Sequence, residues 1–184
     1  MKKFVKILST IILFSFSIFH AQQIKVLEPY YLKDGKSEQF EKATAKIEAK
    51  AIGMGYGGVN NYLTIFNSKH STVRFKNNEI PKFYIKLPDN AFSESITIVK
   101  ADKVKESKTY RRFVQSGVSA GGTKDMSKYQ IVLPLKTTEN SVYEIIIPQN
   151  LEAGEYSFVI NSGVQYDPFT NPMEKKLFCF AIEP

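Results

Sequence analysis

Apolar side chains recur at every second position along almost the whole chain beyond residue 21. The runs that show this alternation are Val73 and Phe75; Phe83, Ile85 and Leu87; Ile96 and Ile98; Tyr143, Ile145 and Ile147; Tyr156, Phe158 and Ile160; and Phe178, Phe180 and Ile182. A period of two is typical of half-buried β-strands rather than of helices. Turn formers such as Asp34-Gly35 and Ala153-Gly154 bound the short runs. The pattern therefore predicts an all-β fold, a single antiparallel β-sandwich of about eight to ten strands.

One segment, 37–51, fits two secondary structures. Phe40, Ala43 and Ile47 are spaced as on one face of a helix, and the composition also favours a helix. However, alanine or isoleucine at every odd position from 43 to 51 alternates with threonine or a charged residue, as in a strand. Because an Asp-Gly turn precedes the segment, we predict a strand that forms a hairpin with residues 30–32 and leaves one charged face in water.

The first 21 residues have the composition of a secretory signal peptide. Lys2, Lys3 and Lys6 precede the apolar run 7–19, and Ala21 offers a small residue for cleavage. The run is shorter than the about 20 apolar residues that a membrane-spanning helix needs. No cysteine for lipid attachment lies near it. We therefore expect a signal peptide at 1–21, a single domain at 22–184, and export to the periplasm or the cell exterior in a form that is not a lipoprotein.

The charge and the cysteine content restrict the partners of the exported domain. The whole chain has a formal net charge of +7, but removal of the three signal lysines leaves 22 basic and 18 acidic side chains, a net charge of +4. A balance this mild does not imply nucleic acid, and none is expected. Cys179 is the single cysteine, and its apolar neighbours predict an ordinary core position. We also expect no cofactor, because nicotinamide nucleotides and ATP are not ordinary partners outside the cytoplasm.

Two glycine-containing motifs match patterns found in enzymes. The run from Gly53 to Gly58 has the spacing of a dinucleotide-binding loop, but the strand-like residues 59–66 follow it where a helix is required. Ser119 lies in a Gly-x-Ser-x-Gly sequence that matches the nucleophile elbow of α/β-hydrolases. No histidine follows Ser119, and His70 is the single histidine outside the signal. We therefore interpret both motifs as turns and predict no catalytic or cofactor-binding site. We also predict no metal site, since a catalytic zinc needs about three protein ligands.

A basic segment and a pair of tyrosines are the candidate binding features. Residues 100–112 contain six cationic and two acidic side chains. The weak candidates for surface binding are Lys105, Lys108, Arg111 and Arg112. A charged hairpin is more often a solvated edge than a site. The tyrosine pair at 30–31 would offer an aromatic platform for a sugar, although the absence of tryptophan speaks against one.

A series of short motifs runs through most of the chain after residue 29. The motifs are Tyr30-Tyr31-Leu32 before Asp34-Gly35, a glycine-rich turn, Pro81-Lys-Phe83-Tyr-Ile85, Ile98-Val-Lys100, Arg111-Arg112-Phe113, Val142-Tyr143-Glu-Ile145 and Leu151-Glu-Ala-Gly154-Glu155-Tyr156-Ser-Phe158. In this order they resemble uncharacterised exported β-rich, sandwich-like proteins of Bacteroidota. The resemblance implies the same fold and export, and it brings no established activity.

The residues and the resemblance lead to one expected function and two alternatives. We expect a non-enzymatic exported binding or structural module of the cell envelope, with an envelope protein or an anionic glycan as the candidate partner. The alternatives are a hydrolase of envelope or extracellular polymers and an accessory subunit of a surface complex. A pocket with convergent acids, or His70 facing a serine or an aspartate, would favour the enzyme. An exposed basic or apolar patch would favour binding.

Overall fold

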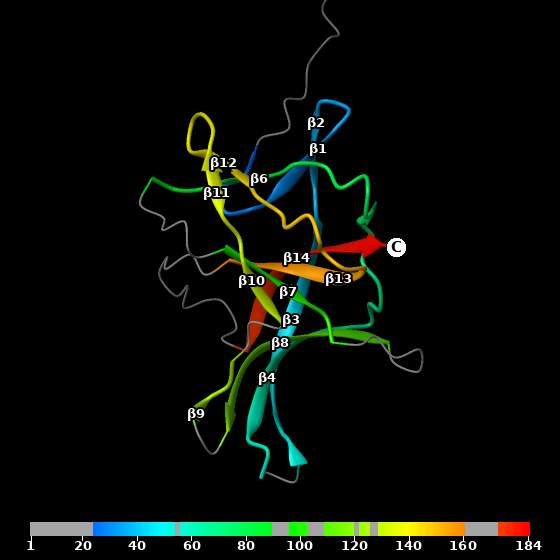
Figure 1. Cartoon of the computed structure of the whole chain (residues 1–184), viewed down its shortest axis with the longest axis vertical. Coiled ribbons are helices and arrows are strands. Elements are labelled where there is room, and N and C mark those ends of the chain that lie inside the picture. The colour runs from blue at the N-terminus through cyan, green and yellow to red at the C-terminus, as the bar shows by residue number, and fades with distance from the viewer. Residues whose placement is uncertain are drawn as a thin grey trace, which may run out of the picture.

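Fourteen strands make up the described part of the chain. A computed structural model describes residues 24–53, 56–89, 96–102, 109–119, 122–125, 129–160 and 173–184. In chain order the strands are β1 (Tyr30–Lys33), β2 (Lys36–Gln39), β3 (Glu41–Ala51), β4 (Val59–Phe66), β5 (Arg74–Lys76), β6 (Phe83–Lys86), β7 (Ile96–Lys100), β8 (Tyr110–Ser119), β9 (Gly122–Thr123), β10 (Gln130–Val132), β11 (Leu135–Thr137), β12 (Val142–Ile145), β13 (Gly154–Ile160) and β14 (Glu174–Glu183). They confirm the all-β prediction (Figure 1). They outnumber the about eight to ten strands expected, because pieces as short as β9 and β11 are too brief to show alternation.

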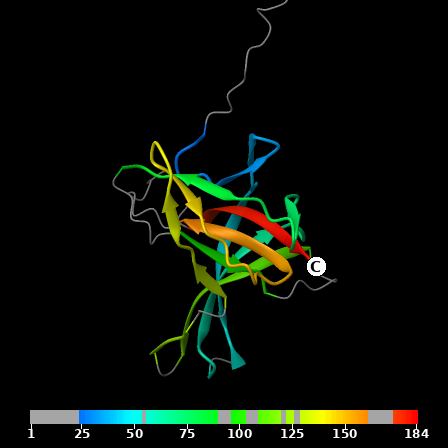
Figure 2. The same cartoon turned by 45° about the horizontal axis from the view of Figure 1, so that its top comes forward.

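The strands form two sheets. The smaller has the order β11-β12-β6-β1-β2, and the larger has the order β10-β7-β13-β14-β3-β4-β8-β9, with β5 added beside β14. Neighbouring strands are antiparallel except β5, which runs parallel to β14. The larger sheet curls into a half-barrel (Figure 2), and a bridge between Ala101 and Phe113 brings β8 back to the chain that follows β7. Within the described residues, no helix is long and apolar enough to cross a membrane.

The hairpin predicted at the Asp-Gly turn is present, and segment 37–51 is extended rather than helical. Asp34 and Gly35 have φ values of 52° and 74°, and two consecutive positive values suit the tight turn between β1 and β2. Phe40 separates β2 from β3, so the chain leaves the smaller sheet there and enters the larger one. The strand prevails over the helix because its alternation buries Ala45 and partly buries Ala43 and Ile47 inside the curl.

Two hydrophobic clusters lie on opposite faces of the larger sheet. The first contains residues of both sheets and is centred on Phe40, whose ring centroid lies 4.9 Å from that of Phe83 in β6 and 5.0 Å from that of Phe158 in β13. The second fills the inside of the curl and consists of Ala45, Leu63, Ile65, Val99, Phe113, Val159, Leu177 and Cys179. Both faces of β13 and of the second half of β14 are buried. In β14 this makes residues 177–182 continuously apolar, whereas β13 keeps its alternation, with Glu155 and Ser157 buried on the face of the second hydrophobic cluster.

Both glycine motifs lie at hairpin ends, as predicted, although part of each lies outside the described residues. The motif that ends at Gly58 joins β3 to β4, so a strand leaves it. Gly58 has a φ of 86°, and a Cβ there would collide with the backbone of Val118, so the position requires glycine. Ser119 ends β8, and its hydroxyl donates to the carbonyl of Gly122 in β9 at 3.4 Å. The stretch 163–174, which has two prolines and no alternation and therefore predicts a loop, also lies almost wholly outside the described residues.

Candidate functional site

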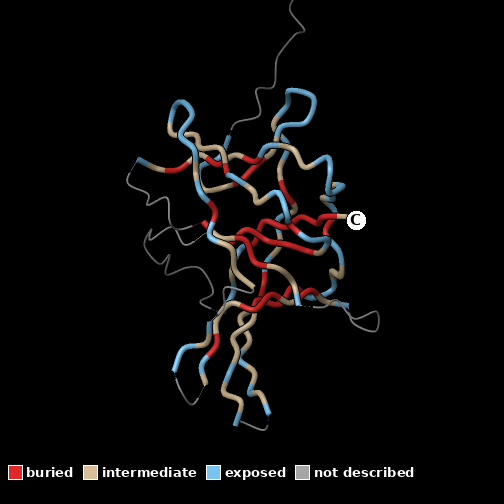
Figure 3. The backbone as a smooth tube through the Cα atoms, in the orientation of Figure 1, coloured by how far each residue is buried: buried red, intermediate tan, exposed pale blue. Residues whose placement is uncertain are grey.

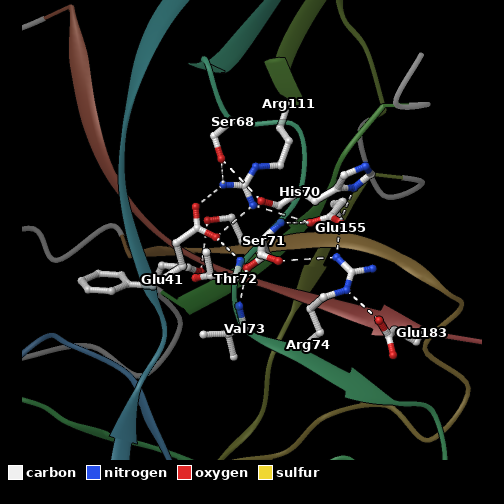
Figure 4. A network of polar contacts seen from close by, with 12 residues as sticks. Glu41, Ser68, His70, Ser71, Thr72, Val73, Arg74, Arg111, Glu155 and Glu183 are labelled. Atoms are coloured by element: carbon white, nitrogen blue, oxygen red, sulfur yellow. Dashed lines mark hydrogen bonds and ion pairs between the residues drawn. The ribbon is translucent and has the colours of Figure 1, made fainter. Parts of the chain in front are cut away.

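A group of charged and polar side chains closes one end of the curled sheet (Figure 4). We call it the Arg111 cluster, and it consists of Glu41, Ser68, His70, Ser71, Thr72, Arg74, Arg111, Glu155 and Glu183. Glu41 begins β3, while Arg111 and Glu155 are the second residues of β8 and β13. Segment 67–73, which joins β4 to β5, lies against these three strand ends.

The strand register places charged side chains inside the curl. Glu41 shares one face of β3 with Ala43 and Ala45, of which Ala45 belongs to the second hydrophobic cluster and Ala43 packs against it. Arg111 is in the same register as Phe113, and Glu155 in the same register as Val159, which both belong to that cluster. The second hydrophobic cluster therefore stops before this end of the curl, and the side chains of the Arg111 cluster take the place of apolar packing there.

Arg111 is the centre of the network and is 0% exposed. Its Nη2 donates to Glu41 Oε1 and, at 3.1 Å, to Ser68 Oγ. Its Nη1 donates to Glu41 Oε2 at 3.3 Å and lies 3.5 Å from Glu155 Oε2. A buried charge is costly unless it is paired and hydrogen-bonded. Two carboxylates and a hydroxyl supply that compensation at the two terminal nitrogens, while the buried Nε of Arg111 has no hydrogen-bond partner within the described residues.

The same two carboxylates hold segment 67–73. Glu155 Oε2 accepts the backbone N–H of Ser71 at 2.8 Å, and Glu41 Oε2 accepts that of Thr72 at 2.8 Å. Burial by itself raises the pKa of Glu41, but hydrogen bonds from Arg111, Thr72 and Ser71, with the charge of the guanidinium, outweigh it and hold that pKa below its ordinary value. Glu41 is therefore favoured as a carboxylate in the folded protein.

His70 and Arg74 form the solvent-facing rim of the cluster. His70, with 54% of its side chain exposed, places Nδ1 3.1 Å from Glu155 Oε1. Arg74 Nη1 donates to the same oxygen at 2.9 Å, and its Nε donates to Glu183 Oε1 at 2.7 Å. The hydrogen bond to Glu183, reinforced by Glu155, outweighs burial and raises the pKa of Arg74. The single histidine outside the signal thus faces a glutamate rather than a serine or an aspartate.

The carboxylates of the Arg111 cluster, and the thiol beside them, are controlled by their close neighbours. All four carboxylate oxygens of Glu41 and Glu155 already accept a hydrogen bond or face a cation. Burial raises the pKa of the nearby Cys179 thiol to about 12, so the thiolate that a nucleophile needs is disfavoured. Within the described residues, no three His, Cys, Asp or Glu side chains gather where they could hold a metal ion. The arrangement ties segment 67–73 across the end of the curl.

The structure separates the four residues predicted to bind at the surface. Lys105 and Lys108 lie outside the described residues. Arg111 is buried, which corrects its expected place on a basic surface, because it shares the inward register of Phe113. Arg112 follows it in β8 and therefore points to the opposite, outer side of the sheet, where it is partly exposed.

Arg112 belongs to a solvent-facing area, which we call the outer face, on β14, β3, β4 and β8. The β3–β4 hairpin projects below the rest of the body, and its residues there are mostly intermediate or exposed (Figure 1 and Figure 3). The register places Glu174, Lys46, Thr64 and Arg112 in one row across the four strands. Counted over the described residues from the row of Thr44 and Lys176 to the end of the β3–β4 hairpin, and with Lys124 beside Asn60, its charged members are the cations Lys46, Lys50, Arg112, Lys124 and Lys176 and the acids Glu48 and Glu174. The outer face is therefore basic.

Aromatic rings alternate with cations on this face. The Arg112 guanidinium carbon lies 5.0 Å from the ring centroid of Tyr62 and 4.8 Å from that of Tyr110. Its Nη2 also donates to the Tyr110 hydroxyl at 2.6 Å. Phe66, 46% exposed, has its centroid 6.3 Å from that of Tyr110, and Lys46 Nζ lies 6.0 Å above the Phe66 ring. We call these five side chains the aromatic strip.

The tyrosine pair proposed as a sugar platform lies elsewhere and does not form one. Tyr30 is only 8% exposed and stacks on Tyr84 at 5.6 Å between centroids. Tyr31 packs edge-on against Phe75 at 5.0 Å, beside the first hydrophobic cluster. Burial, first of all, raises the pKa of both tyrosine hydroxyls. Their rings are therefore committed to packing.

Sequence reasoning named Arg112 but missed Glu41, Glu155 and the other four residues of the aromatic strip, although a signal for part of them exists. A charge in register with apolar residues, such as Glu41 before Ala43 and Ala45, indicates a buried partner. Tyr62 and Phe66 likewise share one face of β4. The sequence does not show which strand pairs with β4, so Arg112 could not be placed between two rings in advance.

The geometry of these two regions is the basis for any functional conclusion. A comparison of the chain with protein-family models, with curated proteins and with solved structures finds no match.

Proposed function

We propose that the protein is an exported, non-enzymatic β-sandwich module of the cell envelope that attaches to a negatively charged envelope component through its outer face. The observation that carries this proposal is the basic character of that face, on which five cations accompany two acids over the described residues. Opposite charge on a partner would raise the association rate and hold the two surfaces together.

Two further features support the β-sandwich and the export. Side chains of both sheets interdigitate around Phe40, as in a two-layer β domain. The signal-like composition of residues 1–21, which lie outside the described residues, favours a place in the periplasm or outside the cell.

The Arg111 cluster favours binding or support over hydrolysis. A hydrolase of polymers would need an acid or a histidine poised to transfer a proton to a substrate. Glu41 and Glu155 instead spend their oxygens on Arg111 and on the backbone of segment 67–73. The groups that would first suggest catalysis are thus used to hold the fold.

Retention of residues 22–184 on a sulfated polysaccharide column tests the proposal. Replacement of Lys46, Lys50 and Lys176 by alanine removes three charges from the outer face, so this variant should elute at a clearly lower salt concentration than the unchanged protein. Fewer ion contacts should also make its retention less dependent on salt.

A second triple variant provides the control. Lys33, Lys76 and Lys82 are exposed, lie off the outer face, and carry the same total charge. Their replacement by alanine should change elution much less. Equal shifts for the two triple variants would show that only net charge matters, and would contradict a binding role for the outer face.

A further inference from the structure

We infer that Arg112, fixed between Tyr62 and Tyr110, is the recognition point for the anionic groups of an acidic polysaccharide. The inference rests on the proposed function and names its ligand class: a glycan that carries carboxylate, sulfate or phosphate groups on some of its sugars.

Arg112 is held in place by rings rather than by a carboxylate. The guanidinium carbon lies 5.0 Å and 4.8 Å from the ring centroids of Tyr62 and Tyr110, and Nη2 donates a hydrogen bond to the Tyr110 hydroxyl. Its Nε is buried and has no hydrogen-bond partner within the described residues. Arg112 also forms no ion pair within the described residues. Its positive charge therefore remains available to an incoming anion.

Stacking prepares the side chain for binding. A free arginine loses conformational freedom when it is fixed against a ligand, and that loss weakens the complex. Rings on two sides have already restricted Arg112, so less freedom remains to be lost. A planar guanidinium also matches the two oxygens of a carboxylate, sulfate or phosphate better than an ammonium group does.

The surroundings of Arg112 suit sugars. Tyr62, Tyr110 and Phe66 offer apolar ring surfaces with polar neighbours, which is how flat sugar faces are usually received. Lys46 stands at the far end of the aromatic strip, above Phe66. Side chains on one face of a strand repeat every two residues, about 6.6 Å, so rings and cations follow one another along an extended ligand.

The acids of the outer face favour a glycan over single-stranded nucleic acid. Stacking rings and cations also bind nucleic acid strands, which carry a phosphate at every nucleotide. Glu174 lies in the same row as Lys46 and Arg112, and Glu48 lies opposite Tyr62 in the next row. These carboxylates would repel a ligand charged at every unit. With a glycan whose charged groups are more widely spaced, the same carboxylates would accept hydrogen bonds from the hydroxyls of the uncharged sugars.

Binding measurements with defined polymers test the inference. Residues 22–184 are titrated with polygalacturonate, dextran sulfate, a poly(sugar phosphate), neutral dextran and oligothymidylate, and the variants are Arg112→Gln, Arg112→Lys and, as control, Lys33→Gln. We expect one or more of the acidic polysaccharides to bind and neutral dextran not to bind. Arg112→Gln should weaken that binding about tenfold or more, and Arg112→Lys should recover only a small part, because the charge returns without the planar fork. Lys33→Gln should bind as the unchanged protein does.

Each contrary result has a distinct meaning. If Arg112→Lys binds as tightly as the unchanged protein, the polymer recognises the positive charge of the face and not the guanidinium. That result overturns the inference, while the proposed function stands. Absence of binding to every acidic polymer overturns both. Tighter binding of oligothymidylate than of any glycan overturns the inference in favour of nucleic acid. A cooperative thermal unfolding transition shows that each variant is folded. If Arg112→Gln does not fold, the comparison of Arg112→Lys with the unchanged protein tests the inference.

Discussion

Arg111 and Arg112 are neighbours in β8 with the same side chain, yet they lie in opposite environments. Arg111 is buried inside the curl, where Glu41 and Glu155 compensate its charge. Arg112 lies on the outer face, where the rings of Tyr62 and Tyr110 enclose it. A shift of one residue along a strand reverses the face that a side chain occupies. The comparison shows that strand register, rather than residue type, decides whether a cation supports the fold or remains available for a ligand.

The two environments also differ in how much stability depends on them. Loss of one partner from a buried ion pair leaves an uncompensated charge and typically costs about 3–5 kcal/mol. A cation stacked on rings near solvent contributes about 0.5–1 kcal/mol. The fold should therefore depend strongly on Arg111 and weakly on Arg112.

The largest effect should follow from Arg111→Met. Methionine fills much of the same space but leaves Glu41 and Glu155 without their shared cation. We expect the free energy of unfolding to fall by about 3–5 kcal/mol, measured by urea denaturation at neutral pH.

A triple variant identifies the cause of that loss. In Arg111→Met combined with Glu41→Gln and Glu155→Gln, the buried negative charges are gone but the amide oxygens still accept the backbone N–H groups of Ser71 and Thr72. This variant should regain part of the lost stability. If it is less stable than Arg111→Met alone, the loss arises from packing and not from unpaired charge.

The two arginines also show how far the sequence leads. Alternation predicted the strands, the Asp-Gly turn predicted the β1–β2 hairpin, and its apolar neighbours predicted the core position of Cys179, because each depends on neighbours in the chain. The same alternation, applied to Arg111 before Phe113, would have placed Arg111 inside. Apart from Tyr110 in the same strand, the partners of the two arginines come from β3, β4, β13 and segment 67–73, and no local rule specifies those pairings. Local periodicity thus gives the face of a residue, whereas the tertiary fold gives its neighbours.

An intermediate effect should follow from Glu41→Gln, and it should depend on pH. The pKa of Glu41 is lower in the folded protein than its ordinary value of 4.5. The stabilisation from its carboxylate is therefore fully present above about pH 4.5 and is lost as the pH falls through the lower folded value. At pH 7 we expect Glu41→Gln to cost about 2 kcal/mol, since it weakens charge-assisted hydrogen bonds. The difference from the unchanged protein should shrink as the pH falls to about 3, below the ordinary pKa of a glutamate.

Glu79→Gln is the matched control for this titration. Glu79 has 62% of its side chain exposed and lies 3.8 Å from Lys76, so it should contribute little at any pH. Urea unfolding of both variants at several pH values measures the two differences. A difference for Glu41→Gln that stays constant with pH would mean that its carboxylate has no special role in the Arg111 cluster.

The smallest effect should be the coupling between Arg112 and Tyr110. A double-mutant cycle with Arg112→Ala and Tyr110→Leu should give a coupling free energy of about 0.5–1 kcal/mol, because the stacked guanidinium remains partly in contact with water. The equivalent cycle with Arg111→Met and Glu41→Gln should give a clearly larger value, because both groups are shielded from solvent. Equal coupling in the two cycles would remove the distinction between the two arginines. Arg112 would then be a structural residue like Arg111, and a ligand would have to compete with the fold for its guanidinium. A small coupling leaves the guanidinium oriented at little cost to stability, which is the condition that recognition of an anionic group requires.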